Sequence, residues 1–348
     1  WLIIMFDVIT IGSATRDSLL APEGFEIRKH ADSPTGVEQC FPLGSKIEIK
    51  EMVFTTGGGG TNSAVTFGRQ GFKTACVGMV ANDLIGKEIV DELKREGVKP
   101  IFQVHGGGHT ACSVILVFPN GERTILSYKG EGQHFDVNKV SFGKLKAKWF
   151  YIDSLGGHLD LLEALISHAV KNGIKIACNP GGKEIEHGVE KLKPLLAQMD
   201  VFIINKEEGI QLLGEELTES HEHVLNELQK IVKGIVVVTD GHSGVRVRMK
   251  DPTGGTSREF RAGVPDSPIV ERTGAGDAFG SGFVAEYMRQ SSDPSVNSGQ
   301  AIMKAIQLAT ANASSVVTKF GAKAGILKKG DWGPWPLVEV EERQVTKY

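Results

Sequence analysis

A short run of small residues leads directly into a predicted helix and has an acidic residue at the junction. The run consists of Gly274, Ala275 and Gly276, and Asp277 follows it. Helix amino termini carry unpaired backbone N–H groups and a partial positive charge, and small side chains let an anion approach them closely. Asp277 lies where the helix dipole favours its ionised form, which can accept a proton from an attacking hydroxyl. The pattern suggests phosphoryl transfer.

The same residues have a structural interpretation. Glycines commonly form the turn before a helix, and an Asp in the first turn commonly serves only as a partner of the helix dipole. Apolar residues recur every fourth position at Phe279, Phe283 and Tyr287, which predicts that this helix buries one face. Glycines followed by an Asp therefore do not distinguish a catalytic from a structural role, and the residues around them have to be considered as well.

Four consecutive glycines form a second informative stretch. Residues 57–60 are all glycine, and Thr61 and Asn62 follow them. Glycine is costly inside a helix or strand because its backbone loses much entropy, so four in a row indicate close approach to another group. The stretch lacks the Lys-Ser/Thr ending of a P-loop and the spacing of the dinucleotide fingerprint. Taken alone, it fits a flexible hinge as well as a ligand loop.

The elements that must position these residues alternate in type. Buried strands are predicted at residues 6–12, 74–79, 149–153, 174–178, 201–205 and 235–239, and helices at 159–171, after 183 and at 299–317. Strands alternating with helices predict a parallel sheet covered on both faces, with sites at the carboxyl edge. Period-two alternation within 18–56 predicts half-exposed strands, which also fit an ordinary surface hairpin. Residues 112–118 and 123–128, joined by 119–122, predict a further hairpin.

Composition restricts the class of protein. The chain has 348 residues and a formal net charge of −3, without the basic stripe that nucleic-acid binding requires. No apolar run approaches the roughly 20 residues that span a bilayer. Four cysteines lie far apart, without a C-x-x-C pair, as expected of reduced thiols in a cytoplasmic protein. We expect no nucleic-acid or membrane partner.

The string from Thr273 to Phe279, followed by Gly-x-Gly-Phe, closely resembles the carboxy-terminal signature of the PfkB carbohydrate kinases, the ribokinase-like family. The glycine stretch ending at Asn62 resembles the family's Gly-Gly-x-x-x-Asn signature. The resemblance implies a doubly wound α/β fold: a mostly parallel sheet flanked by helices, with a small β-sheet lid. It implies one kinase domain over residues 5–330, with lid segments at about 15–56 and 100–130. Residues 331–348 are left as a tail, although their tryptophans indicate that part of it packs down.

The resemblance also implies roles for individual residues. Asp277 corresponds to the catalytic base, and residues 274–276 to the anion hole. The sugar contacts would be Asp17, Gly57, Gly58 and Asn62; the ATP contacts would be Asn205, Thr239, Gly241, Gly244, Asn312 and Gly321. Glu208, with Asn205, would bind Mg²⁺ through water. The family commonly has Asp-Thr where this chain has Glu271 and Arg272, and that Asp often helps to hold a monovalent cation. A K⁺ ion is therefore possible here, but this departure from the family pattern does not support it.

The expected reaction is transfer of the γ-phosphoryl group of ATP to a primary hydroxyl of a small sugar. Two alternatives remain open at this point: an adenosine-like nucleoside kinase, and a sugar-binding regulatory protein that has lost catalysis. The residues expected to line the acceptor pocket follow no motif that identifies the sugar. The half-exposed lid strands also suit a contact between two copies of the chain.

Overall fold

A large twisted sheet forms the centre of the computed structural model, which describes residues 5–31, 33, 36–118, 123–215, 220–250 and 256–346. Its ten strands lie in the order β16-β15-β14-β13-β12-β11-β10-β1-β6-β7. The bounds are β1 Phe6–Ile11, β6 Thr74–Ala81, β7 Lys99–His105, β10 Ala147–Ile152, β11 Lys175–Cys178, β12 Val201–Asn205, β13 Ile235–Thr239, β14 Val245–Lys250, β15 Thr256–Ala262 and β16 Glu341–Thr346. In this order, the strands from β13 through β1 to β7 pair in parallel with their neighbours, and β14, β15 and β16 add an antiparallel edge next to β13. The mostly parallel sheet expected from the sequence is confirmed.

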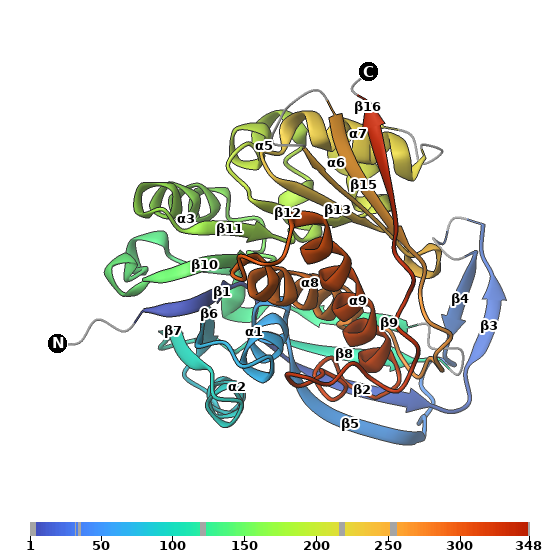
Figure 1. Ribbon diagram of the computed structural model, residues 1–348. Helices are drawn as coiled ribbons and strands as arrows, with labels where there is room; N and C mark the ends of the chain where they lie inside the picture. The colour runs from blue at the N-terminus through green and yellow to red at the C-terminus, as the bar shows by residue number, and fades with distance from the viewer. Residues whose placement is uncertain are drawn as a thin grey trace.

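Helices cover both faces of this sheet (Figure 1). Apolar side chains from α3 to α7 share one core cluster with the sheet, and those from α1, α8 and α9 share another. The bounds are α1 Gly59–Arg69, α2 Leu84–Arg95, α3 Leu159–Asn172, α4 Gly182–Ile185, α5 Val189–Leu196, α6 Lys206–Leu213, α7 His221–Ile231, α8 Ala275–Ser291 and α9 Ser298–Val317. Strands such as β13 read as unbroken β-branched runs because both of their faces are buried.

A four-stranded sheet forms the lid beside the carboxyl edge, in the order β5-β2-β8-β9 (Figure 1). Its bounds are β2 Thr15–Pro22, β5 Ile49–Gly57, β8 Cys112–Val117 and β9 Arg123–Tyr128, with a separate pair of β3 Glu26–Lys29 and β4 Val37–Cys40. The hairpin strands β8 and β9 are antiparallel as expected, whereas its turn at 119–122 lies outside the described residues.

The two faces of the lid differ in burial. Leu19, Ile115 and Val117 form a small buried cluster on the inner face, against Phe320. The outer lid face carries exposed apolar side chains, namely Met52, Phe54, Leu126 and Tyr128. Strands with one buried and one exposed face produce the period-two pattern seen in the sequence.

Two boundaries expected from the sequence are wrong. The lid segment 100–130 begins too early, because β7 pairs with β6 in the large sheet. The supposed tail at 331–348 supplies β16, which pairs antiparallel with β15 at the sheet edge. Short strands of charged residues such as Glu341 to Thr346 carry little apolar signal, so only the pairing identifies them. Trp332 and Trp335 do pack down, half-buried beside α9. No helix among the described residues is long and apolar enough to cross a membrane.

Candidate active site

The amino ends of α1 and α8 bring the two glycine motifs together at the carboxyl edge of the sheet. Nδ2 of Asn62, on the first turn of α1, donates a 2.7 Å hydrogen bond to Oδ2 of Asp277. Asn62 is 3% exposed, and its Oδ1 has no hydrogen-bond partner among the described residues. A buried carbonyl oxygen without a donor is costly. This oxygen is therefore suited to accept a hydrogen bond from a bound hydroxyl group.

Asp277 lies in the first turn of α8, half-buried, as the sequence predicted. Burial raises the pKa of its carboxyl group, and the negative charge of Asp17 raises it further. The hydrogen bond from Asn62 and the positive charge of Lys323 act in the opposite direction on this pKa. A carboxylate with a raised pKa holds an abstracted proton more firmly, which suits a general base.

Gly274 and Gly276 take different positions at the start of α8. Gly274 is the N-cap residue at φ 78°, and a methyl group there would overlap Ala322. Gly276 has open space beside it, since an added Cβ would meet no atom within 4 Å. The first N–H groups of a helix lack intrahelical acceptors. The open side of Gly276 thus gives an anion access to this helix terminus.

Asp17 and Asp153 lie against the glycine loop from two sides. Asp17, on β2, is 5% exposed and accepts a hydrogen bond from Thr15. A methyl group on Gly57 would overlap the Asp17 carboxylate, and one on Gly59 would overlap that of Asp153. Two of the four positions therefore require glycine, because a carboxylate approaches the backbone closely at each of them. Gly58, at φ 92°, is the N-cap of α1.

Asp153 is a site residue that the sequence analysis missed. It follows β10 and accepts hydrogen bonds from the Ser154 amide, at 2.7 Å, and from the Ser63 hydroxyl, at 3.4 Å. Burial, and then the charge of Asp277, raise its pKa well above the usual value. The available signal was its place directly after a buried strand that ends at the carboxyl edge. Asp17, Asp153 and Asp277 make the acceptor side strongly acidic.

Asn205 and Glu208 form a capping box at the start of α6. The Glu208 amide donates to Asn205 Oδ1 at 2.8 Å, and the Asn205 amide donates to Glu208 Oε2 at 3.2 Å. Burial raises the pKa of Glu208, and the charge of Asp277 contributes to this rise. Within the described residues, no group of three or more acidic, His or Cys side chains forms a metal cage. One carboxylate at the sheet edge fits a Mg²⁺ ion that keeps most of its waters.

The expected nucleotide contacts divide into two groups. Thr239 ends β13, and Gly241 and Gly244 flank the short turn that leads into β14. Gly321 lies beside Thr55, and its amide donates to Glu271 at 3.3 Å. The three glycines lie on turns or loops, and Thr239 is the last residue of its strand.

Asn312 differs from these loop residues. It is 1% exposed, and its side-chain amide donates to the Ala278 carbonyl and accepts from the Leu327 amide. These hydrogen bonds join α9 to α8 and to the loop that follows α9.

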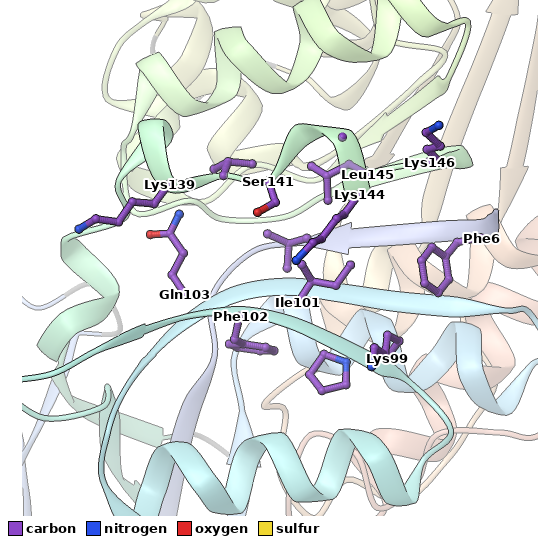
Figure 2. A pocket seen from close by; sticks show the side chains of 14 residues that line it. Phe6, Lys99, Ile101, Phe102, Gln103, Lys139, Ser141, Lys144, Leu145 and Lys146 are labelled. Atoms are coloured by element: carbon purple, nitrogen blue, oxygen red, sulfur yellow. The ribbon is translucent and has the colours of Figure 1, made fainter. Parts of the chain in front are cut away.

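A cleft of about 590 Å³ lies away from this site, beside the edge strand β7 (Figure 2). Its walls include Ile101, Phe102 and Lys144. Figure 2 shows the Lys139 and Lys146 side chains directed away from its centre, so its charged groups do not converge on one point. We assign it no part in the chemistry.

The fold and the helix-start motifs define a class of protein, the kinases with a ribokinase-like fold. The chain matches the pfkB family carbohydrate kinases over residues 30–329, and it belongs to that family. Members of this family are phosphotransferases with alcohol acceptors, and so is this protein. The class and the family expected from the sequence are both confirmed.

Individual relatives agree with this assignment. The chain is 28% identical to a ribokinase of Haemophilus influenzae over 303 residues, which cover 85% of this chain and 92% of that one. It is 25% identical to an uncharacterized sugar kinase of Archaeoglobus fulgidus over 277 residues, covering 76% and 98%. The structure of a ribokinase from Giardia lamblia superimposes with a TM-score of 0.74 at 20% identity, covering 94% and 97%. An adenosine kinase from Sinorhizobium meliloti gives 0.72 at 21% identity, covering 92% and 96%.

Proposed function

We propose that the protein transfers the γ-phosphoryl group of ATP to a primary hydroxyl group of a small sugar, with Asp277 as the general base. The hydrogen bond between Asn62 and Asp277 is the observation that carries this proposal, because it joins the acceptor motif to the base. Family membership supports the use of ATP. Three buried or half-buried carboxylates and the unpartnered Asn62 Oδ1 suit a ligand with several hydroxyl groups.

The reaction is an in-line displacement at the γ-phosphorus. As the acceptor oxygen forms its bond to phosphorus, the bond to the ADP oxygen breaks and the acceptor proton passes to Asp277. Backbone N–H groups of residues 274–276 stabilise the negative charge on the transferred group. When bound, Mg²⁺ would neutralise phosphate charge, held through water by Glu208 and Asn205. Asp17, Gly57, Gly58 and Asn62 hold the acceptor.

For the nucleotide side we propose Asn205, Thr239, Gly241, Gly244, Asn312 and Gly321. Apart from Asn312 on α9, they lie at or near the strand ends, where α/β folds bind their ligands. The outer lid face supports a separate proposal, that two copies of the chain pair through their lids. Its exposed apolar side chains are of the kind that contact partners.

The test is ADP release by the purified protein with Mg-ATP across a panel of sugars, sugar phosphates and nucleosides. Asp277→Asn should lower acceptor-dependent release by about 10²- to 10⁴-fold while retaining ligand binding. Asp160→Asn, on the exposed surface of α3, makes the same chemical change away from the site and should leave turnover unaltered. Near-normal turnover in Asp277→Asn would refute the assignment of the base. Acceptor binding without turnover by the wild-type protein would instead indicate a regulatory protein.

A further inference from the structure

Strand β7 forms one edge of the large sheet, where it pairs with β6 only (Figure 1). The Asn82 amide donates to the His105 carbonyl oxygen at 2.8 Å, so the backbone groups of His105 face β6. Backbone groups point alternately to the two sides of a strand, and those of Phe102 and Val104 therefore face away from the sheet. These groups have no hydrogen-bond partner in the part of the chain that the structure describes. They are donors and acceptors that another strand could use.

Pro100 belongs to the same outward row. It stands two residues before Phe102, so its backbone nitrogen lies on the outer side, where a missing N–H costs the sheet no hydrogen bond. Val104 is 60% exposed, and Phe102 is half-buried. The free edge of β7 thus combines unpaired backbone groups with apolar side chains.

Two clefts follow this edge. The cleft of about 590 Å³ in Figure 2 and a second one of about 460 Å³ share Phe102, Gln103 and Lys139 in their walls. Together they extend along β7 from Lys99 to Gly106. Seven residues of a strand span about 23 Å, which is the length of an extended segment of chain. We refer to the surface formed by residues 99–106 and 139–146 as the β7 groove.

The far wall of the β7 groove is fastened to the strand. The Gln103 side chain donates to the Asp136 carbonyl oxygen at 2.8 Å and accepts from the Asp136 amide at 3.3 Å. Asp136 begins the short turn that ends at Lys139. Farther along this wall, Leu145 is buried in the core that contains Phe6 and Val77. The groove is therefore formed before any partner binds.

The charges along the β7 groove are positive. Lys99, Lys144 and Lys146 are exposed, and within the described residues they form no ion pair. Lys139 is also exposed and lies 3.3 Å from the Asp136 carboxylate. Neither cleft has an acidic side chain among its described lining residues. Figure 2 shows the lysines of the far wall at separate places along it. Positive charge spread in this way is complementary to several spaced negative charges and not to one small anion.

We propose that the β7 groove docks an extended acidic segment of a partner protein. The segment would pair with the outward backbone groups of Phe102 and Val104 and place its carboxylates beside Lys99 and Lys144. Addition of a strand to an exposed sheet edge is an established mode of peptide recognition. A second copy of the chain fits less well, because two β7 edges would bring lysines of like charge together. The inference is independent of the proposed function.

Binding of a defined peptide tests this inference. The probe is a labelled peptide of about ten residues with alternating valine and glutamate, titrated into the full chain and followed by fluorescence anisotropy, without ATP or acceptor. We expect saturable binding that weakens about tenfold when NaCl is raised from about 50 mM to about 500 mM, because salt screens exposed charges. The same peptide with lysine in place of glutamate should not bind. Absence of saturable binding by the glutamate peptide would overturn the proposal and leave Pro100 and the lysines only the role of keeping the edge unpaired.

Charge reversal in the groove locates the bound peptide. Lys144→Glu should weaken binding about five- to tenfold, because an attraction between exposed charges becomes a repulsion. Lys328→Glu reverses an exposed lysine of the loop after α9 and is the matched control. Equal affinities of the two variants would place the peptide elsewhere and contradict the proposal.

Pairing with the backbone of β7 is tested separately. Val104→Pro removes an outward N–H and should weaken binding about three- to tenfold, the value of one neutral hydrogen bond, whereas Val104→Ala keeps the N–H and serves as its control. If Val104→Pro does not fold, peptides methylated on alternate backbone nitrogens apply the same test to the wild-type chain, and one of the two methylation patterns should abolish binding. Full binding by both methylated peptides would show that no strand is added.

Amide hydrogen exchange provides a direct readout. Exchange within residues 99–106 should slow when the glutamate peptide binds, because the outward amides gain acceptors. Unchanged exchange in this segment at saturating peptide would contradict the proposal. None of these measurements uses turnover, so a failure of the proposed kinase reaction would not alter their interpretation.

Discussion

The Asn62 amide donates its hydrogen bond to Asp277 across a sequence separation of 215 residues. One end of the amide holds the base, and the other end, Oδ1, is buried without a donor among the described residues. The same side chain therefore orients the Asp277 carboxylate and, in the proposed function, offers a hydrogen-bond acceptor to the substrate. The two ends of this amide lead to separate predictions, one for acceptor binding and one for the pH dependence of turnover.

Asn62→Ala should raise KM for the acceptor by about three- to tenfold, the value of one neutral hydrogen bond. In the wild-type protein, the hydrogen bond from Asn62 favours the ionised form of Asp277 and lowers its pKa. Its loss should therefore raise this pKa and shift the acid limb of kcat/KM to higher pH. The measurement is a pH series of initial rates at varied acceptor. Asn172→Ala, at the exposed end of α3, is the control. A change in the KM for ATP alone would mean that Asn62 contacts the nucleotide and not the acceptor.

Asp17→Asn should lower kcat/KM for the acceptor by about 10- to 100-fold, the range for a hydrogen bond to a charged group, with KM for ATP unchanged. Gly57→Ala should act in the same direction, because its methyl group would displace the Asp17 carboxylate. Gly182→Ala has open space around it and controls for the glycine substitution. Initial rates with each substrate varied in turn separate the two sides. Normal acceptor kinetics in Gly57→Ala would show that the contact with Asp17 is not needed.

Glu208→Gln should raise the Mg²⁺ concentration for half-maximal activity several-fold, since a neutral amide attracts the hydrated ion less. Its unfolding free energy should change little, because Gln also serves in a capping box. Asn205→Ala should cost about 1 kcal/mol of stability through loss of the N-cap. Metal titrations and thermal melts of both variants measure these effects. If Glu208→Gln lost stability and kept its Mg²⁺ response, Glu208 would be only a capping residue.

Activity should be equal within about twofold in KCl and in NaCl at the same ionic strength. Glu271 is fully buried, and its carboxylate oxygens accept hydrogen bonds from the Thr273 amide at 3.0 Å and the Gly321 amide at 3.3 Å. Backbone N–H groups thus already bind the Glu271 carboxylate, which stands at the position of the family's cation-binding Asp. Initial rates in the two salts and in choline chloride measure the effect. Tenfold activation by KCl alone would reject this interpretation of Glu271.

Phe54→Lys should convert a lid-paired dimer to a monomer, because it replaces an exposed apolar side chain of the outer lid face with a charge. Phe54 is half exposed and pairs in register with Ser18, which in turn pairs with Val114. Sedimentation velocity measures the change, with Leu43→Lys, fully exposed outside the strands, as the control. A wild-type protein that sediments as a monomer would exclude pairing through the lid.

Local patterns in the sequence determined much of the fold. Buried strands such as 201–205 and 235–239 were predicted within a residue of their observed bounds, because unbroken β-branched runs identify strands buried on both faces. The positions of Asp277 and Gly274 at a helix start also follow from local spacing. By itself, the sequence also indicated the family, through two short strings of residues.

Contacts between distant segments were decided only by the tertiary structure. Asp153 carries no motif, and it joins the site because the fold places its carboxylate against Gly59 of the glycine loop. The two hydrogen bonds of Asn312, to Ala278 and to Leu327, likewise depend on the fold and not on a local pattern. The strand β16 depends on its pairing with β15. The periodicity of apolar residues indicates which face of a helix or strand is buried. It does not indicate which other element covers that face, because this depends on packing between segments that are distant in the sequence.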